Sequence, residues 1–224
     1  ARTSGAYSRV RTQFKTPIGY FEGIEEALAR IGGNTYMMDA ARVMTAGAVD
    51  LGEKPSVASA IVKYHLTERG RQAISDAMDI HGGKGICIGP RNYLGRTYQQ
   101  IPVSITVEGA NILTRNMIIF GQGAIRCHPY LLKEVNATHD NNPDRASRAF
   151  DEALIGHAKF TLRNTANSLI YALFGNYIKD IVPENSAPET AVYYRQLARF
   201  SASFACIADI GLMRLGGSLK RRER

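Results

Sequence analysis

Hydrophobic residues recur at helical spacing along almost the whole chain. One stripe over residues 24–44 predicts a first long helix. Residues 52–55 then combine a glycine that can end a helix with a proline that can start the next one. Residues 56–80 predict a second long helix. No convincing run alternates with the two-residue period of a half-buried strand, so the predicted fold class is all-α.

Glycine and proline divide the rest of the chain. Residues 82–85 are expected to end the second long helix, and the pair Ile101-Pro102 marks the loop-like stretch that follows it. A polar linker at residues 139–144 separates two predicted domains, 1–138 and 145–224. Further helices are predicted over residues 93–99, from about 106 to 120 with a break at 121–123, over 128–135, and over 145–177 and 188–215.

Basic residues outnumber acidic ones. The 224 residues include 28 Lys and Arg against 20 Asp and Glu, a formal net charge of +8. A basic surface attracts anions, so nucleic acid, anionic lipid headgroups and phosphate-bearing small molecules are all partner classes to consider. Arg9, Arg11 and the terminal residues 220–224 are where a nucleic acid or a membrane would bind, although charge runs are more often simply solvated.

The three cysteines, Cys87, Cys127 and Cys206, are odd in number and far apart, and no CxxC or Cys/His cluster exists. We therefore expect no metal site, no disulfide framework and a reducing compartment. No apolar run is long enough to span a bilayer. Because the sequence opens on Ala1 without a methionine, we expect it to be a piece of a longer polypeptide.

Glu108 is the residue that most suggests chemistry. It precedes Gly109 at the predicted start of an apolar helix. A structural interpretation makes Thr106 the N-cap and Glu108 a first-turn acid that faces the positive end of the helix dipole. A functional interpretation places the carboxylate in a dry, apolar site, beside a glycine that lets a ligand approach closely, where it can act as a base.

Two further stretches could contact a phosphate or a ring. Gly82, Gly83 and Gly85 leave backbone groups bare at a helix end, although many helices end in glycine without a ligand. Because these glycines do not follow a strand, a Rossmann dinucleotide motif is excluded. Arg11 and Phe14 combine a guanidinium that can pair with phosphate and a ring that can stack, although a solvated basic segment is the plainer interpretation.

Taken in order, these stretches resemble the acyl-CoA dehydrogenase family. Arg11-x-x-Phe14 is similar to the family's R-x-x-F-G segment, with Lys15 at the position of its first glycine. The helix end at residues 80–85 is similar to Q-x-x-G-G-x-G, and residues 107–109 are similar to the start of Y-E-G-T.

Later segments resemble one branch of that family. Residues 121–130 and 216–224 look like the longer bacterial acyl-CoA dehydrogenases of fatty-acid β-oxidation. The resemblance implies an up-and-down helical bundle of the C-terminal acyl-CoA dehydrogenase type, plus an extra helical C-terminal region. In this family an N-terminal helical domain and a middle β-domain precede the bundle, so the isolated chain is expected to be inactive.

The family's activity and partners are implied as well. They are oxidation of fatty acyl-CoA to trans-2-enoyl-CoA, FAD as cofactor, and an electron-transfer flavoprotein or similar acceptor. The resemblance also implies a homo-oligomer with no nucleic-acid partner. A cytoplasmic location is implied, with any membrane association residing in parts of the parent chain outside this sequence.

The family's residue roles carry over position by position. Glu108 is implied to remove the α-proton of the thioester, and Gly109 to lie beside that thioester. Glu22 and Asp79 stand where the family commonly has glutamine, and a carboxylate near a pyrophosphate is unfavourable. The positions implied to contact FAD are Arg11, Phe14, Glu22, Asp79, Gly82, Gly83, Ala110 and Ile112.

A function from a different class stays open at this point. A non-catalytic basic helical module could bind nucleic acid, a membrane or a protein partner. Steeply salt-dependent binding to DNA or anionic lipid would mark that class. FAD bound to the full-length parent would mark the dehydrogenase instead.

Overall fold

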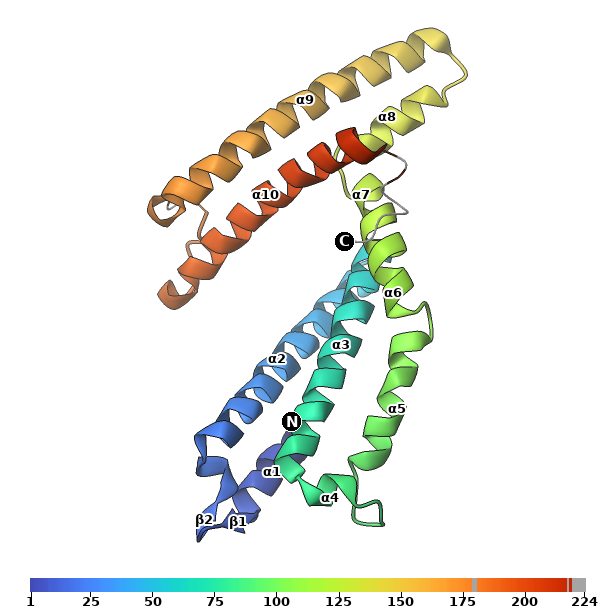
Figure 1. Cartoon of the computed structure of the whole chain (residues 1–224). Helices are drawn as coiled ribbons and strands as arrows, with labels where there is room; N and C mark the ends of the chain where they lie inside the picture. Colours follow the sequence, from blue (N-terminus) through green and yellow to red (C-terminus); the bar gives the residue numbers. More distant parts are fainter. Residues whose placement is uncertain (179–180, 217, 219–224) are drawn as a thin grey trace. The chain divides into compact units, whose positions relative to one another are not determined.

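The structure is a computed structural model, and it describes residues 1–178, 181–216 and 218 (Figure 1). The basic residues 220–224, considered above as a binding site, lie outside the described residues. The described part is almost entirely helical, and its strands form a single short hairpin. The predicted all-α class is therefore confirmed. The chain divides into two compact units, residues 1–119 and residues 120–224.

The first unit is built on a pair of long helices. Its elements, in order, are α1 (Arg2–Val10), β1 (Thr12–Gln13), β2 (Thr16–Pro17), the 3₁₀ turn η1 (Ile18–Tyr20), α2 (Glu22–Asp50), α3 (Ser56–His81), α4 (Gly83–Ile86), α5 (Gly95–Thr106), α6 (Asn111–Leu113) and the π-helix η2 (Thr114–Gln122), which extends past the end of the unit. Both long helices follow the predicted positions, and Gly52 between them has a positive φ of 86°. The predicted break between α2 and α3 is confirmed.

The α2–α3 pair is antiparallel and contains the core of the first unit (Figure 1). Ile31 of α2 and Ala77 and Ile80 of α3 are buried together. Beside them the carboxylate of Asp76, also buried, accepts hydrogen bonds from the Arg30 guanidinium at 3.2 and 3.4 Å. Helices α1, α4 and α5 also pack against α3, so α3 is the central helix of this unit.

The second unit is a helical hairpin. Its elements are α7 (Gly123–Arg126), α8 (Leu131–Thr138), α9 (Pro143–Phe174), η3 (Gly175–Tyr177), η4 (Pro188–Thr190) and α10 (Ala191–Leu215). Helices α9 and α10 pack side by side and antiparallel (Figure 1). Asn142 caps α9, because its side-chain oxygen accepts from the amides of Asp144 and Arg145 at 3.1 Å. The helices predicted over 145–177 and 188–215 are confirmed.

The unit boundary differs from the domain boundary that the polar linker suggested. Residues 139–144 do form the loop between α8 and α9. However, α8 packs against α9, so residues 120–138 belong to the second unit. The linker is a tight helix connection inside one unit, because Asp140 pairs with Arg145 across it at 2.5 Å.

Two expected breaks are wrong. Helix α5 runs through Pro102 to Thr106. Pro102 lies on an exposed face, so the helix carbonyl that lacks its amide partner there can be hydrated. Helical winding also continues through residues 121–123, as η2 passes directly into α7. A change from π to α winding replaces the expected break.

Membrane insertion can be judged from the helices of the described residues. None of them combines the length and the apolar character that crossing a bilayer requires.

The hairpin of β1 and β2 presents Phe14 on an unusual backbone. Gln13 pairs with Thr16, and the two residues between them, Phe14 and Lys15, have φ values of 49° and 63°. Two positive φ values are typical of the tight hairpin turn that glycine and asparagine favour. Lys15 therefore occupies a glycine conformation, which is consistent with glycine at this position in the resembled family.

Replacing Lys15 by glycine removes this backbone strain. Gly also makes the unfolded chain more flexible, which costs about 0.4–1 kcal/mol at any site. Lys54 is an exposed loop lysine without a positive φ and serves as the control. We expect Lys15→Gly to be about 1 kcal/mol or more favourable than Lys54→Gly in urea denaturation. Equal effects of the two variants would show that Lys15 is not strained.

Candidate functional site

Glu108 lies on a turn between α5 and α6. Its φ is 54°, and that of Gly109 is 88°. Thr106 does not cap a following helix, since it is the last residue of α5 and its hydroxyl donates back to the carbonyls of Pro102 and Val103. Helix α6 begins only at Asn111, with no acid in its first turn. The interpretation of Glu108 as a first-turn acid is therefore wrong.

Lys63 of α3 supports this turn through hydrogen bonds. Its ammonium donates to the Gly109 carbonyl at 2.8 Å and to the side-chain oxygen of Asn111 at 2.6 Å. Thr114 donates to the same Gly109 carbonyl at 3.0 Å. Because an ammonium has donors but no acceptor, it suits a turn whose carbonyls converge on one point.

Asn111 completes the support. Its amide nitrogen donates to Thr67 and Glu68 of α3, each at 2.9 Å. Its side chain is therefore satisfied at both ends while the residue is buried. Asn111 and Lys63 together attach the strained turn to the long helix, which is the kind of surrounding that maintains an unfavourable φ.

The side chain of Glu108 itself is exposed in this chain. The residues around it are apolar and also exposed, with Val107 at 47% and Ile112 at 77%. The dry environment expected for a working base would thus have to come from whatever covers this surface. Ala110 is half-buried and directly precedes α6.

A second feature is a hollow of about 870 Å³, here called the Arg11 hollow. It brings together four of the residues that the sequence analysis associates with a cofactor. Its described lining residues are Tyr7, Val10, Arg11, Thr12, Gln13, Phe14, Ile18, Phe21, Ile24, Ile80, His81, Gly82, Gly83 and Lys84. Gly82 has a φ of 53°, and a Cβ at Gly82 or Gly83 would meet open space, so their backbone is bare toward the surroundings.

One wall of the Arg11 hollow is rigid. His81 is buried, and its Nδ1 donates to the Ala77 carbonyl at 2.7 Å while its Nε2 faces the Tyr93 hydroxyl at 2.5 Å. Burial lowers the pKa of His81, so the ring is neutral and holds these two bonds. Its ring stacks on Tyr7 at 4.1 Å between centroids. His81 therefore has a structural role in this wall.

The charge of the hollow suits an anion. Arg11 and Lys84 line it, and no acidic residue is among its described lining residues. Glu22 is exposed in the first turn of α2, and Asp79 is exposed on α3, yet neither lines the hollow. The sequence analysis placed these two carboxylates near a pyrophosphate, where a negative charge is unfavourable. They are absent from the described lining of the hollow. Phe14 adds an aromatic ring that is 88% exposed.

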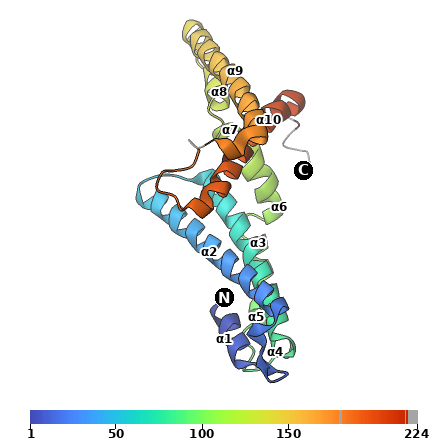
Figure 2. The same cartoon turned by 90° about the vertical axis from the view of Figure 1, so that its left-hand side faces the viewer.

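The turn and the hollow are at opposite ends of α3. Figures 1 and 2 show α4 and the hairpin near one end of this helix and α6 near the other. Lys63 and Gly82 are 19 residues apart in sequence, which corresponds to about 28 Å of helix. Within one chain, Glu108 and Arg11 therefore lie at separate sites.

Sequence reasoning missed Lys63, Asn111 and Lys84. Lys63 and Asn111 act on Glu108 through contacts that span more than 40 positions, and neither belongs to a local motif. Lys84 could have been found, since it stands within the glycine motif at residues 82–85 and its ammonium lies 5.3 Å from the Tyr7 ring.

Removing the Lys63 ammonium should loosen the Glu108 turn. Lys63→Met leaves the oxygens of Gly109 and Asn111 without this donor, a loss of about 1–3 kcal/mol. We expect backbone amides of residues 107–114 to exchange with solvent about 5- to 150-fold faster in hydrogen-exchange measurements. Lys54→Met, at an exposed lysine, is the control. Unchanged exchange in Lys63→Met would contradict the support role.

Comparison with known proteins gives matches along the whole chain. The family sequence model "Acyl-CoA dehydrogenase, C-terminal domain" matches residues 1–121, and "Acyl-CoA dehydrogenase, C-terminal, bacterial type" matches residues 125–224. No solved structure matches.

Two curated relatives match part of the chain. A "3-(aryl)acrylate reductase" of Clostridium sporogenes is 30% identical over 116 residues, covering 50% of this chain and 29% of that protein. A "Probable acyl-CoA dehydrogenase" of Bacillus subtilis is 26% identical over 135 residues, covering 51% of this chain and 22% of that protein. The matched regions thus span less than a third of each relative. Since the first family model matches more than half of the sequence, the chain belongs to the acyl-CoA dehydrogenase family.

Proposed function

We propose that this chain is the C-terminal part of an FAD-dependent enzyme that oxidises fatty acyl-CoA to trans-2-enoyl-CoA in β-oxidation. Glu108 is the base that removes the α-proton, and Gly109 lies beside the thioester. The observation that carries the proposal is the positive φ of Glu108, a non-glycine residue held in place by Lys63 and Asn111. Backbone strain that is maintained by a dedicated network is typical of functional sites.

The chemistry requires a carboxylate at this position. An acyl thioester is weakly acidic at its α-carbon, so the base must be close to the proton and shielded from water. The exposed apolar residues Val107 and Ile112 give a covering domain or substrate chain a surface to exclude water. FAD, when bound, supplies the hydride acceptor that no side chain provides.

The Arg11 hollow is the proposed contact for the phosphate-bearing part of FAD. Arg11 and Lys84 would pair with the pyrophosphate, and the bare backbone of Gly82 and Gly83 would allow close approach. Phe14 would pack near the nucleotide. Because its described lining residues include no acid, the hollow fits an anionic group.

The separation between hollow and turn supports a homo-oligomer. The hydride acceptor must lie at the substrate, next to Glu108, whereas the hollow lies about 28 Å along α3 in the same chain. A second copy that brings its Arg11 hollow to the first copy's Glu108 removes this conflict. The remaining partners we propose are an electron-transfer flavoprotein or similar acceptor, in a cytoplasmic parent protein.

The direction of the reaction is open to one alternative. The Clostridium relative is named a reductase of an arylacrylate. Reduction of a double bond next to a carbonyl is the reverse of the proposed oxidation, so Glu108 would then return a proton to the α-carbon. Product analysis with saturated and unsaturated thioesters separates the two directions.

Glu108→Gln in the full-length parent tests the base. Glutamine keeps the size of the side chain but cannot accept the proton, so we expect kcat to fall about 10²- to 10⁴-fold. The FAD content of the purified enzyme should stay unchanged, since Glu108 is not part of the Arg11 hollow. Glu53→Gln, at an exposed loop residue, is the control. Turnover within a few-fold of the unsubstituted enzyme would exclude Glu108 as the base.

Arg11→Gln tests the cofactor contact. Loss of a charge-assisted hydrogen bond to phosphate should weaken FAD binding by about 1.5–3 kcal/mol, or about 10- to 150-fold in Kd. Arg9→Gln, an exposed neighbour on α1 that does not line the hollow, should bind FAD normally. Equal FAD affinity in both variants would refute the assignment.

Mixed oligomers then test whether the contact is made by a second copy. A mixed dimer of an Arg11→Gln chain and a Glu108→Gln chain has one intact site if Arg11 serves the neighbour's cofactor. It has no intact site if Arg11 serves its own chain. We expect the purified mixed dimer to show about half the activity of the unsubstituted dimer, because one of its two sites is intact. Activity no higher than that of the single variants would show that the contact lies within one chain.

A further inference from the structure

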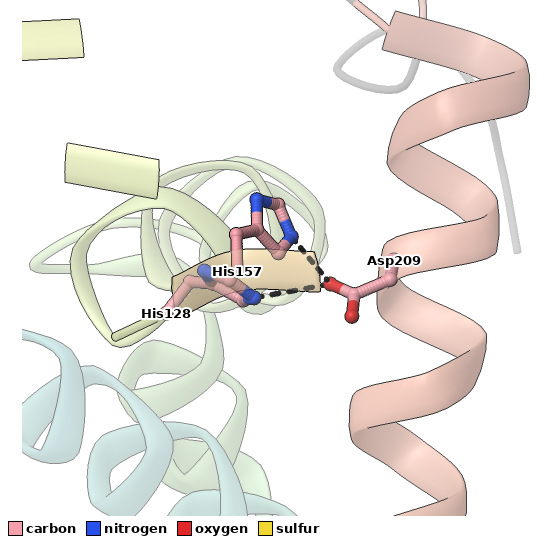
Figure 3. Close-up of side chains that lie close together, drawn as sticks. All are labelled: His128, His157 and Asp209. Atoms are coloured by element: carbon pink, nitrogen blue, oxygen red, sulfur yellow. Dashed lines mark hydrogen bonds and ion pairs between the residues drawn. The ribbon is translucent and has the colours of Figure 1, made fainter. Parts of the chain in front are cut away.

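The second unit contains a cluster of three potential metal ligands. His128 lies just before α8, His157 on α9 and Asp209 on α10 (Figure 3). One ligand atom from each lies within 4.8 Å of the others. Asp209 Oδ1 is 3.0 Å from His128 Nε2 and 3.4 Å from His157 Nε2. The sequence analysis expected no metal site, because it found no CxxC or Cys/His cluster; His128, His157 and Asp209 come together only in the fold.

The cluster is largely buried, and its carboxylate faces two histidines instead of a lysine or an arginine. The Asp209 side chain is 2% exposed and that of His128 is 7% exposed. Among the described residues, the polar contacts of Asp209 are with His128, His157 and Thr161, and no lysine or arginine pairs with it. A buried carboxylate requires a compensating cation.

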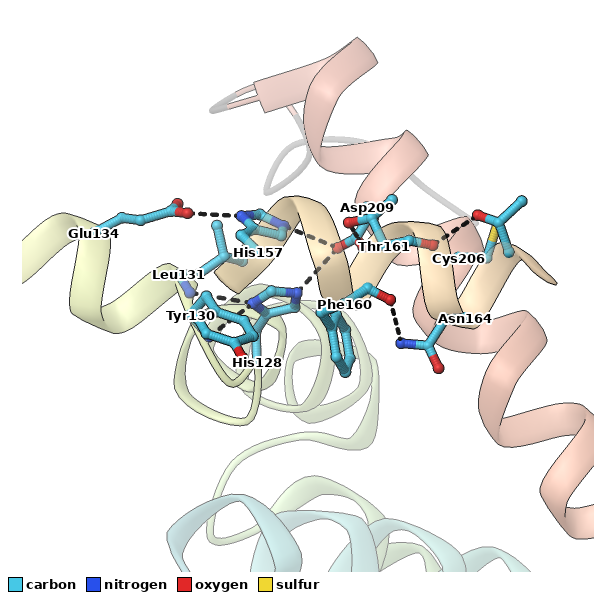
Figure 4. A network of polar contacts seen from close by, with 11 residues as sticks. His128, Tyr130, Leu131, Glu134, His157, Phe160, Thr161, Asn164, Cys206 and Asp209 are labelled. Atoms are coloured by element: carbon cyan, nitrogen blue, oxygen red, sulfur yellow. Dashed lines mark hydrogen bonds and ion pairs between the residues drawn. The ribbon is translucent and has the colours of Figure 1, made fainter. Parts of the chain in front are cut away.

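The surrounding hydrogen bonds orient the ligand atoms. Nδ1 of His157 donates to Glu134 at 2.7 Å, so in a neutral ring the Nε2 lone pair faces Asp209 (Figure 4). Thr161 donates to Asp209 Oδ2 at 2.6 Å, which leaves Oδ1 directed at the two histidines. A carboxylate behind a ligating histidine is the usual outer support of a metal site.

His128 adds a second, independent observation. Its Nε2 is buried and has no hydrogen-bond partner in the described part of the chain, although Asp209 Oδ1 is only 3.0 Å away. His128 Nε2 and Asp209 Oδ1 are therefore close together, but their geometry is not that of a hydrogen bond. A buried nitrogen near a carboxylate oxygen, without such a bond, is the arrangement expected of two ligands directed at a common point.

We propose that His128, His157 and Asp209 bind one first-row divalent cation, with Zn²⁺ as the probe. Tetrahedral zinc with bonds of about 2.0–2.1 Å separates its ligand atoms by roughly 3.3–3.4 Å. The His157–Asp209 distance of 3.4 Å matches, and the His128–Asp209 distance of 3.0 Å is a few tenths of an ångström shorter. The charges of Asp209 and Glu134 balance the ion.

The ion would join three parts of the second unit: the segment before α8, α9 and α10. The site does not depend on the proposed dehydrogenase chemistry, because it includes neither the Glu108 turn nor the Arg11 hollow. Its role is to stabilise this unit, since the metal is bound by the folded arrangement of residues that are distant in sequence.

Coordination by His128 has a local consequence. Its Nδ1 accepts from the backbone amides of Tyr130 and Leu131 at 3.2 and 3.1 Å. A ligating Nε2 must be unprotonated, so the ring proton moves to Nδ1 and both amide bonds are lost. The amide signals of these two residues therefore report metal binding at His128.

Calorimetric titration of the untagged, chelator-treated 224-residue chain with ZnCl₂ tests the proposal. We expect saturation at one ion per chain, with NMR shifts in the amides of Tyr130 and Leu131. His157→Gln and Asp209→Asn should each weaken binding at least about tenfold, and Glu134→Gln about 10- to 100-fold. Circular dichroism establishes that each variant is folded.

His139→Gln is the matched control for His157→Gln, because His139 is exposed and outside the cluster. It should bind zinc as the unsubstituted chain does. Absence of saturable binding would overturn the proposal. Binding that survives in Glu134→Gln and His157→Gln but is lost in His139→Gln would also overturn it, because the ion would then be bound at the surface.

Discussion

The ammonium of Lys63 is the contact on which the candidate active site depends. It attaches the Glu108 turn to α3 through the Gly109 carbonyl and Asn111. A positive φ is uncommon for a residue other than glycine and is maintained only where the surrounding contacts hold it. The turn interrupts the chain between α5 and α6, and it directs a carboxylate outward among apolar residues. Burial of Asn111 and Thr114 below the turn makes that geometry rigid.

The same long helix supports the other half of the proposed chemistry. α3 ends at His81. Gly82 and Gly83 follow it directly and line the Arg11 hollow. One helix therefore separates the proposed base from the proposed phosphate contact by a fixed length, and that length is the reason for proposing a second copy. Phe14 and Ile112 are both exposed in the single chain, and the proposed assembly would give each of them a surface to pack against.

The sequence predicted the parts that depend on local pattern. The helices α2, α3, α9 and α10 follow from apolar periodicity and from glycine and proline at their ends. The break predicted at Pro102 was wrong, because a proline on an exposed helix face costs less free energy than the rule that proline ends a helix assumes. The N-cap role suggested for Thr106 was wrong as well, since its hydroxyl bonds back into α5 instead of capping a new helix.

The candidate sites also divide into residues that local motifs predict and residues that only contacts in the fold reveal. Arg11, Phe14, Gly82 and Gly83 meet in one hollow, and short motifs were enough to group them. Lys63, His157 and Asp209 could not be found, because each acts through a partner that is distant in sequence and no pattern records such a contact. Glu22 and Asp79 were assigned by position in a motif, but neither lines the hollow.

The central claim is that Glu108 removes the α-proton. Its most direct test is a structure of the full-length parent with FAD and an unreactive acyl-CoA analogue, in which the distance from the Glu108 carboxylate to the α-carbon is measured. The account predicts about 3–3.5 Å, the separation of reacting atoms in a near-attack arrangement. A Glu108 side chain directed away from the thioester, with another basic group at the α-carbon, would contradict it.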